Sequence, residues 1–384
     1  MSKHPLLRRI NRGTQHRLSL YARLLKYELK WGSEVDVPLK RRLWLWRRGF
    51  TSESDVLFDV NEENYREYLS TIQQERSMDI ASKWSGTTGN KLVSHLLFDS
   101  VPEHLPELYG LIVNGTLKRT SRVMDVPPWQ QSSETDPVAS GGRGVPEYDA
   151  AEWVETHLDE RGVLVLKPVY GRAGKGVLVC RKEDGSEEYE VNGSTKTRRE
   201  FVSLVEELDE CLATEFVEQA EYAERLFPDS TNTLRVMTFW DYETDEPFVG
   251  AVVQRIGSSE SAPTDNFSGG GISAEVGEDG TLSRGVQWLS SEGDVRWYET
   301  HPSSGSQIAG ATVPNWSAIR EQILELASLY PYIRKVGWDI LVTGEESFKI
   351  LELNVGAGTR SIQAHSPLLR DPRVRQFYEY HDCL

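Results

Sequence analysis

Short apolar runs separated by Gly and Asp dominate the second half of the chain, and each is about the length of one strand. Stretches with helical periodicity lie between them, which predicts an alternation of strands and helices. The predicted strands span residues 163–168, 176–181, 212–217, 233–240, 248–256, 336–343 and 348–353. The predicted helices span residues 149–159, 198–210 and 315–329. The pattern therefore predicts an α+β fold whose late strands are mostly antiparallel.

The first hundred residues follow a helical pattern instead. Apolar residues recur at near-helical spacing through residues 3–30 with Lys and Arg between them, which predicts a basic amphipathic helix. A second basic stretch, residues 40–48, interleaves Leu and Trp, and residues 62–78 and 89–99 predict further helices. Pro, Gly and Ser concentrate in residues 126–149, which predicts a long loop. Two interpretations of the basic helices remain open, namely packing on the main body or contact with a membrane surface or another anionic partner.

The composition fits a folded protein in a reducing compartment. The 384 residues are 38% hydrophobic and 27% charged, which is typical of globular proteins and excludes disorder of the whole chain. No apolar run reaches the roughly 18–20 residues of a membrane span, and the basic N-terminus lacks the apolar stretch of a secretory signal. Cys180, Cys211 and Cys383 form no C-x-x-C pair, so neither a disulfide framework nor a structural zinc site is expected. We therefore expect a cytoplasmic protein.

Charge is distributed unevenly along the chain. Residues 1–50 contain 13 Lys and Arg against 3 Asp and Glu, a net charge of +10. Because the whole chain carries −16, the other 334 residues carry −26. An acidic body of this kind argues against binding nucleic acid, which requires a broad basic face. Arg outnumbers Lys by 30 to 13, which is typical of proteins from a salty cytoplasm but also follows from a biased nucleotide composition.

A glycine-rich segment with two cations is the first candidate for chemistry. The chain contains no H-E-x-x-H, no G-x-S-x-G and no kinase H-R-D set. Residues 171–176, G-R-A-G-K-G, match neither the Walker pattern nor the dinucleotide fingerprint, and they lie between two predicted strands. Backbone N–H groups and cations in such a hairpin can close over phosphates. The alternative is a surface hairpin without a ligand.

Three oxygen-bearing side chains near the C-terminus form the second candidate. Residues 337–343 and 348–354 predict a hairpin with a four-residue loop, in which Thr343 lies opposite Phe348. Counting back along both strands places Asp339 opposite Glu352, with Asn354 on the same face. Facing carboxylates repel each other unless a cation lies between them, and an all-oxygen set favours magnesium. The alternative is an exposed polar face of the hairpin.

Several motifs occur in an order that resembles the ATP-grasp ligases. They are N-K-L-V-S-H-L-L-F, K-P-V-Y-G-R-A-G-K-G, T-E-F-V-E, N-T-L-R-V, N-F-S-G-G-G and W-D-I-L-V-T followed by I-L-E-L-N-V-G-A-G. G-F-T-S-E upstream and S-I-Q-A-H-S-P-L-L at the end resemble the sugar-transfer-associated branch, which is related to α-L-glutamate ligases. The resemblance covers residues 85–365 and extends back to about residue 48. It implies an ATP-grasp fold, in which two α+β lobes clasp ATP, with a mainly helical, basic N-terminal extension.

The resemblance also implies roles for individual residues. Lys91 and Lys167 would contact ATP phosphates, and residues 171–176 would form a mobile lid. The lid residues singled out are Gly171, Arg172, Gly174, Lys175 and Gly176. The adenine-pairing hinge would be Glu215, Phe216 and Val217, and the ribose ligand Glu218, with Glu221 and Glu224 as alternatives. The charge of the transferring phosphoryl group would be stabilised by Arg235 and Arg255, and two magnesium ions held by Asp339, Glu352 and Asn354.

Taken together, these expectations describe an ATP-dependent, ADP-forming carboxylate–amine ligase that proceeds through an acyl phosphate. Its substrates would be ATP, a small carboxylate and an amine or sugar-linked acceptor, in the biosynthesis of a surface glycan or amino-acid conjugate. Two alternatives are a grasp-fold small-molecule or sugar kinase and a non-catalytic ATP-binding scaffold. Three parts are expected: a basic helical region at 1–84, an N-lobe with the lid at 85–218, and a C-lobe with the magnesium site at 219–384. Residues 1–48 are the candidate contact with the acidic inner face of a membrane.

Overall fold

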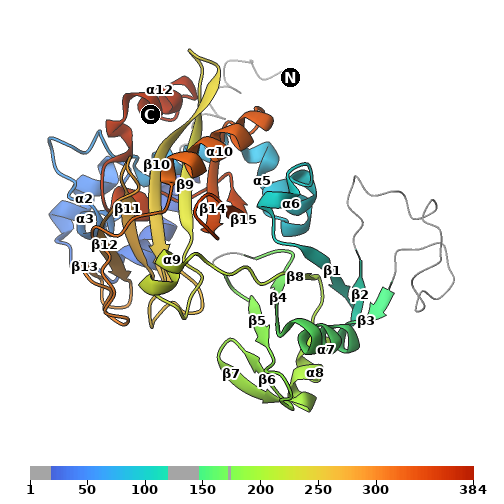
Figure 1. The fold of residues 1–384 in the computed structure, drawn as a ribbon. Coiled ribbons are helices and arrows are strands. Elements are labelled where there is room, and N and C mark those ends of the chain that lie inside the picture. The colour runs from blue at the N-terminus through green and yellow to red at the C-terminus, as the bar shows by residue number, and fades with distance from the viewer. Residues whose placement is uncertain (1–18, 120–146, 172–173) are drawn as a thin grey trace, which may run out of the picture. The chain divides into compact units, whose positions relative to one another are not determined.

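The computed structural model describes residues 19–119, 147–171 and 174–384, and these residues divide into two compact units (Figure 1). The larger unit comprises Met1–Ser85, Glu221–Asp339 and Asn354–Leu384. The smaller unit comprises Gly86–Ala220 and Ile340–Leu353. Within the described residues, none of the helices combines the length and the hydropathy that crossing a membrane requires.

The smaller unit is built on an eight-stranded sheet in which every neighbouring pair of strands is antiparallel. The strand order is β3-β2-β1-β8-β4-β5-β6-β7. The strands are β1 (Leu108–Val113), β2 (Thr116–Lys118), β3 (Glu147–Asp149), β4 (Val163–Pro168), β5 (Leu178–Arg181), β6 (Glu188–Val191), β7 (Ser194–Thr197) and β8 (Cys211–Thr214). The helices are α6 (Lys91–Leu97), α7 (Ala150–Arg161) and α8 (Arg198–Glu206), with a 3-10 turn η2 (Pro102–His104).

Local signals define the two longer helices of the smaller unit. The Asp149 side chain accepts a hydrogen bond from the N–H of Glu152 at the start of α7, and Gly162, with φ 75°, ends the helix in the left-handed region. A capping box of Thr197 and Glu200 starts α8. Both helices bury apolar side chains in a core shared with the sheet, including Val154 of α7. These interactions explain why α7 and α8 begin within one residue of their predicted starts.

The larger unit contains a seven-stranded sheet with the order β13-β12-β11-β10-β9-β14-β15. The strands are β9 (Leu234–Asp241), β10 (Glu246–Ile256), β11 (Ile272–Val276), β12 (Leu282–Leu289), β13 (Asp294–Tyr298), β14 (Lys335–Val342) and β15 (Phe348–Asn354). The last two strands run across the division between the units, which falls after Asp339 and before Asn354. The other elements are α9 (Glu221–Leu226), α10 (Trp316–Leu329), α11 (Arg360–Gln363), α12 (Pro372–Tyr380), and the 3-10 turns η4 (Phe267–Gly269) and η5 (Leu368–Arg370). Figure 1 shows α10 lying along one face of the sheet.

The N-terminal region belongs to the larger unit. Residues 19–27 are helical, and the chain continues through the π-helical turn η1. The elements from there on are η1 (Glu28–Gly32), α2 (Leu39–Arg47), α3 (Ser54–Leu57), α4 (Thr71–Ser77) and α5 (Ser82–Thr88). The predicted helix 3–30 is therefore seen only in its described part. The predicted loop 126–149 lies mostly outside the described residues, and its last three residues form β3.

The helix predicted for residues 62–78 is wrong in its first half, since only α4 is helical there. The Asn61 side chain accepts hydrogen bonds from the N–H groups of Glu63 and Asn64, which satisfies this backbone without a helix. Ser70 then begins α4 with a capping box. The spacing of apolar residues gave no sign that side-chain hydrogen bonds would replace the helix in this segment.

A buried polar cluster joins three segments of the N-terminal region through the side chain of Glu28. The Glu28 carboxylate accepts hydrogen bonds from the Ser52 N–H at 2.7 Å, from the Ser52 hydroxyl at 2.5 Å and from Arg42 Nη1 at 2.7 Å. Glu28 is only 5% exposed, so the pairing offsets the cost of burying its charge. The structure thus groups residues up to Ser85 with the late strands, whereas the sequence suggested a separate region 1–84.

Candidate functional site

Two lysines and a glutamate come together in the smaller unit. Asn90 caps α6 through its side chain, and the N–H of Lys91 donates to the carbonyl of Val169 at 2.9 Å, which places the start of α6 beside the end of β4. The Lys91 ammonium donates to the carbonyl of Gly171 at 3.1 Å and lies 3.8 Å from Glu352 Oε1. The first turn of α6, the glycine-rich segment and β15 therefore converge on one ammonium group.

Lys167 is the second cation of this cluster. Its pKa is lowered to about 8, chiefly by burial and also by the positive charge of Lys91, and the negative charge of Glu352 partly offsets both. Two ammonium groups near one carboxylate leave a net positive charge in a poorly solvated place. A phosphate would supply the missing negative charge and would favour the protonated form of Lys167.

The glycine-rich segment adopts a conformation that needs its glycines. Gly174 and Gly176 have φ values of 70° and 77°, in the region that side chains rarely adopt. A Cβ on Gly176 would also lie 2.9 Å from Pro168 Cγ. Lys175 is exposed between them, whereas Arg172 lies outside the described residues. The role of this segment as a lid stays a prediction.

The hinge predicted at residues 215–218 lies beyond the end of a strand. β8 ends at Thr214, so the strand predicted for residues 212–217 is shorter than expected. The Glu215 N–H donates to the Glu107 carbonyl at 2.9 Å, and the Glu215 carboxylate accepts from the Glu107 N–H at 2.9 Å. The Arg181 guanidinium lies over the Phe216 ring, 4.4 Å from its centroid. Val217 and the exposed Glu218 follow outside the sheet ladder.

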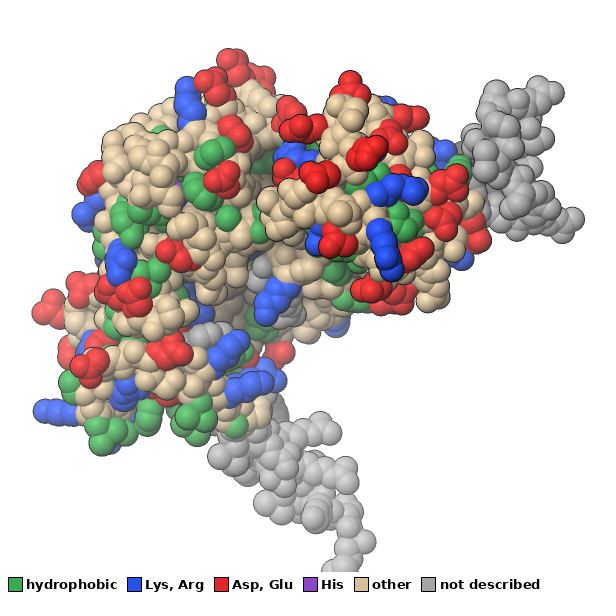
Figure 2. All heavy atoms as spheres, turned by 90° about the horizontal axis from the view of Figure 1, so that it is seen from below, with side chains coloured by type: hydrophobic (Ala, Val, Ile, Leu, Met, Phe, Trp, Pro, Cys, Tyr) green, Lys and Arg blue, Asp and Glu red, His purple; other side chains and the backbone are tan. Residues whose placement is uncertain are grey.

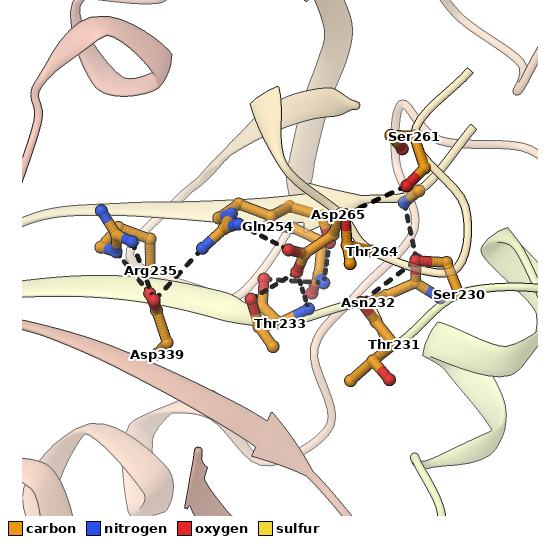
Figure 3. Close-up of polar contacts among 12 residues, drawn as sticks. Ser230, Thr231, Asn232, Thr233, Arg235, Gln254, Ser261, Thr264, Asp265 and Asp339 are labelled. Carbon is orange, nitrogen blue, oxygen red and sulfur yellow. Dashed lines mark hydrogen bonds and ion pairs between the residues drawn. The ribbon is translucent and has the colours of Figure 1, made fainter. Parts of the chain in front are cut away.

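The larger unit holds a second cluster, which Figure 3 shows around Asp339 of β14. Arg235 of β9 donates from Nε and Nη2 to the two carboxylate oxygens of Asp339, at 2.5 and 2.9 Å. Arg255 of β10 places Nη1 3.3 Å from Asp339 Oδ2. Burial by itself raises the pKa of Asp339, but the two guanidinium groups outweigh burial, so its pKa is lowered and it is ionised.

Asp265, Thr233 and Gln254 complete this cluster, and none of them was among the predicted site residues. Arg255 Nη2 lies 2.6 Å from Asp265 Oδ1, and Asp265 Oδ2 accepts from the Thr233 N–H at 2.8 Å and its hydroxyl at 2.5 Å. The buried Gln254 amide donates to the Thr233 carbonyl at 3.2 Å (Figure 3). Two signals were present in the sequence, since Thr233 lies within the N-T-L-R-V motif and Asp265 directly precedes the N-F-S-G-G-G motif. These contacts hold Arg255 in a fixed position.

Asn354 joins the same cluster, because its Nδ2 donates to Asp339 Oδ2 at 3.1 Å. The structure therefore brings together four predicted residues of the larger unit: Arg235, Arg255, Asp339 and Asn354. In the smaller unit it brings together Lys91, Lys167, Gly171 and Glu352.

The hairpin loop before β15 is shorter than the sequence predicted. The N–H of Thr343 donates to the carbonyl of Ser347 at 2.9 Å, and their hydroxyl groups bond at 3.0 Å. Thr343 therefore pairs with Ser347 and not with Phe348, which leaves three residues in the loop. The side-chain hydrogen bond explains the tighter closure. Counting back from Thr343 and Ser347 along regular strands places Asp339 opposite Leu351, so the predicted opposition of Asp339 and Glu352 would need one extra residue in β15.

The predicted magnesium ligands fit a hard cation by their chemistry. All three offer oxygen, the pKa of Asp339 is lowered so that its carboxylate is charged, and Glu352 and Asn354 alternate on one strand, which gives them the same face. Asp339 accepts hydrogen bonds from Arg235 and Asn354 in this structure, so a bound cation would have to displace these donors from its carboxylate oxygens. In the described part of the chain, no group of three or more His, Cys, Asp or Glu side chains is arranged to hold a metal ion.

The family of the chain follows from a match to a family model. The model of the sugar-transfer associated ATP-grasp family matches residues 88–370, which is most of the chain. The chain therefore belongs to this family and has the ATP-grasp fold, so the predicted resemblance and the α+β fold class are confirmed.

Solved structures give weaker similarities. An ADP complex of N5-carboxyaminoimidazole ribonucleotide synthetase is 13% identical over 72% of this chain and 46% of its own, with a TM-score of 0.35. The D-alanine-D-alanine ligase from Coxiella burnetii is 10% identical over 78% and 59%, with a TM-score of 0.36. The L-amino acid ligase from Bacillus licheniformis is 10% identical over 73% and 44%, with a TM-score of 0.34. The match thus spans about half of these chains. No curated protein sequence matches the chain.

Proposed function

We propose that this protein is an ATP-dependent, ADP-forming carboxylate–amine ligase that proceeds through an acyl phosphate. The observation that carries the proposal is the pair of lysines beside the glycine-rich segment. Lys91 and Lys167 share one carboxylate, Glu352, and the pKa of Lys167 is lowered by burial and by the neighbouring ammonium. Such a cluster favours a polyanionic ligand such as the phosphates of ATP.

The smaller unit would bind the nucleotide. Lys91 and Lys167 would contact its phosphates, and the backbone of residues 171–176 would cover them. Glu215, Phe216 and Val217 would pair with adenine, supported by the end of β8 at Thr214, which leaves the following backbone outside the ladder. Glu218 is exposed and would contact the ribose.

The larger unit would stabilise the charge that moves during the reaction. Arg235 and Arg255 are held by Asp339 and Asp265, so their guanidinium groups are already oriented before a substrate arrives. Asp339, Glu352 and Asn354 would hold magnesium, which when bound would neutralise phosphate charge. Arg235 can exchange a carboxylate oxygen of Asp339 for a phosphoryl oxygen, because both accept hydrogen bonds in the same bidentate way.

The proposed reaction has two balanced steps. First, a carboxylate oxygen of the donor bonds to the γ-phosphorus of ATP while the bond from that phosphorus to the β–γ bridging oxygen breaks, which releases ADP. Second, the nitrogen of an amine attacks the acyl carbon, the carbon–oxygen bond to phosphate breaks, and the amine loses a proton to water. The lid would keep water from the acyl phosphate between the two steps. Acceptors linked to a sugar or an amino acid, used on the cytoplasmic side of glycan biosynthesis, are the proposed substrate class.

Trapping the acyl phosphate with hydroxylamine tests the proposal. Hydroxylamine is a small nucleophile that converts an acyl phosphate into a hydroxamate, which is detected as its iron complex. A panel of amino acids and uronic acids serves as donors, with ATP and magnesium. We expect hydroxamate from at least one acid, its loss in Lys167→Ala and Arg235→Ala, and its retention in the exposed-arginine control Arg320→Ala.

The alternatives give different products in the same experiment. ADP together with a stable phosphorylated sugar, and no hydroxamate from any acid, would replace the ligase with a kinase. The absence of ADP under every condition would favour a non-catalytic ATP-binding scaffold.

A further inference from the structure

The helix at residues 19–27 and the turn η1 that continues it carry two apolar faces instead of one. Leu20 and Leu24 are each 3% exposed and pack into the larger unit. Tyr21, Leu25 and Leu29 are 49%, 53% and 77% exposed. Tyr21 and Leu25 are four residues apart in the α-helical part, so they lie on one outward face, and the exposed Leu29 follows in the π-helical turn η1.

The outward face has no role in packing the larger unit. A helix at a protein surface needs one apolar stripe for its core, and its other face is normally polar. Tyr21, Leu25 and Leu29 expose apolar surface to water. Burial of that surface would contribute roughly 25 cal/mol per Å² of favourable free energy. Singly scattered apolar side chains are normal on a protein surface, whereas a contiguous exposed apolar patch marks an interaction site.

The neighbouring helix α2 repeats the pattern. Leu45 is fully buried, whereas Leu39 and Leu43, four residues apart, are 68% and 44% exposed. Lys40 and Arg47 of α2 are exposed as well. The two helices are neighbours, because Arg42 of α2 bonds to Glu28 of η1 and Trp46 packs against the cluster formed by Leu20, Leu24 and Ile72.

Charge identifies the kind of partner. Lys26 and Lys30 are exposed beside the outward leucines. Residues 1–50 carry a net +10, whereas the rest of the chain carries −26. Figure 2 shows acidic side chains spread across one face of the molecule, with Lys and Arg interspersed among them. An anionic surface would therefore attract the N-terminal segment and repel the remainder.

We propose that the outward faces of the helix at residues 19–27, of the turn η1 that continues it and of α2 dock on an anionic lipid bilayer. The bilayer satisfies both observations at once, since acyl chains accept Tyr21, Leu25 and Leu29 while the lipid phosphates attract Lys26 and Lys40. A nucleic acid offers phosphates but no comparable apolar layer. The inference concerns a surface outside the clusters around Lys167 and Asp339, so it stands independently of the proposed function.

Vesicle flotation of the full-length protein tests this surface. Vesicles of phosphatidylcholine with half phosphatidylglycerol are compared with pure phosphatidylcholine at low salt. We expect binding to the anionic vesicles only, and binding should weaken as salt screens the charges. Leu25→Glu/Leu29→Glu should weaken it about tenfold or more, because the apolar contact is lost and two repelling charges are added. Lys26→Gln/Lys40→Gln should weaken it mainly at low salt.

The matched control is Leu329→Glu, at a leucine of α10 that is 58% exposed but lies outside the basic region. It should bind like the wild type. All variants should keep the wild-type thermal midpoint and the wild-type rate of ADP formation in the absence of vesicles. Absence of wild-type binding to anionic vesicles at low salt would overturn the inference, as would equal binding by Leu25→Glu/Leu29→Glu.

Discussion

The two units solve the problem of burying cations in opposite ways. In the larger unit, two arginines meet two aspartates, and Asp339 and Asp265 accept their guanidinium groups at 2.5 to 3.3 Å. In the smaller unit, two lysines meet one glutamate, and the ion pair between Lys91 and Glu352 is a loose 3.8 Å. The first cluster is electrically balanced, whereas the second keeps an excess positive charge.

The two clusters would therefore bind an anionic ligand in different ways. The planar guanidinium group of an arginine binds a carboxylate through two parallel hydrogen bonds, which fixes the orientation of both groups. The arginines of the larger unit are therefore oriented, and its carboxylates are already paired. An ammonium is a point charge whose pKa responds to burial, and the pKa of Lys167 is lowered to about 8 by burial and by Lys91. The lysine cluster of the smaller unit would therefore be stabilised by an added negative charge, whereas the guanidinium groups of the larger unit are already oriented.

The largest effect is expected from removing the carboxylate of the balanced cluster. Asp339→Asn leaves the Arg235 and Arg255 guanidinium groups without their shared anion, so the free energy of unfolding should fall by about 3–5 kcal/mol. ADP formation should fall by about a thousandfold or more, since oriented charge is lost. Chemical denaturation and an ADP assay measure the two effects.

Glu352→Gln is the contrasting variant in the smaller unit. The Glu352 side chain is 28% exposed and its contact with Lys91 is long, so stability should change by less than about 1 kcal/mol while activity is still lost. Equal loss of stability in both variants would contradict the contrast between the two clusters.

Lys167→Met should abolish ATP turnover without destabilising the fold. The substitution keeps the length of the side chain and removes an ammonium whose burial disfavours its charge. Lys335→Met is the matched control, because burial also lowers the pKa of Lys335 to about 8, but its ammonium donates to Ser77 Oγ at 2.9 Å in the larger unit. The control should keep wild-type ADP formation, and both thermal midpoints should stay within a few degrees of the wild type. Wild-type turnover by Lys167→Met would remove it from the site.

Binding of ATP should take up a proton near pH 8. In the free protein the pKa of Lys167 is about 8, so part of the population is neutral at that pH. Phosphates favour the ammonium and raise its pKa, so affinity should fall as the pH rises above 8. Titration calorimetry in buffers of different ionisation enthalpy measures the uptake, which should be absent in Lys167→Met. Equal apparent enthalpies in all buffers for the wild type would count against phosphate contact by Lys167.

The smallest effect is expected from Lys91→Gln on stability. The Lys91 ammonium bonds to the Gly171 carbonyl and pairs loosely with Glu352, so its loss should cost less than about 1 kcal/mol. Removing this like charge should raise the pKa of Lys167 and move the fall in ATP affinity to higher pH, because Lys91 is one cause of the lowered value. An unchanged pH profile would show that burial alone sets the pKa of Lys167.

Strands and helices with strong local signals were predictable from the sequence. The strand at residues 163–168 matches β4, and the helix at 315–329 matches α10 to within one residue, because apolar runs and periodicity are local properties. Two hairpins were missed although their signal was present. Asn114-Gly115 and Asn192-Gly193 have positive φ at both residues, which is typical of the two-residue turns that join β1 to β2 and β6 to β7.

The sequence by itself also determined the family, because the order of motifs along a chain can be recognised without knowing which residues are in contact, and it supplied the residues of the candidate site. Only the tertiary structure decided which charges meet. Asp265 lies 74 residues before its cluster partner Asp339 along the chain, yet both hold Arg255, and Lys91 reaches Gly171 across 80 residues. It also grouped the N-terminal region with the larger unit. Such pairings depend on how sheets and helices bring distant segments of the chain together, and a local pattern of residues does not show which distant segments will meet.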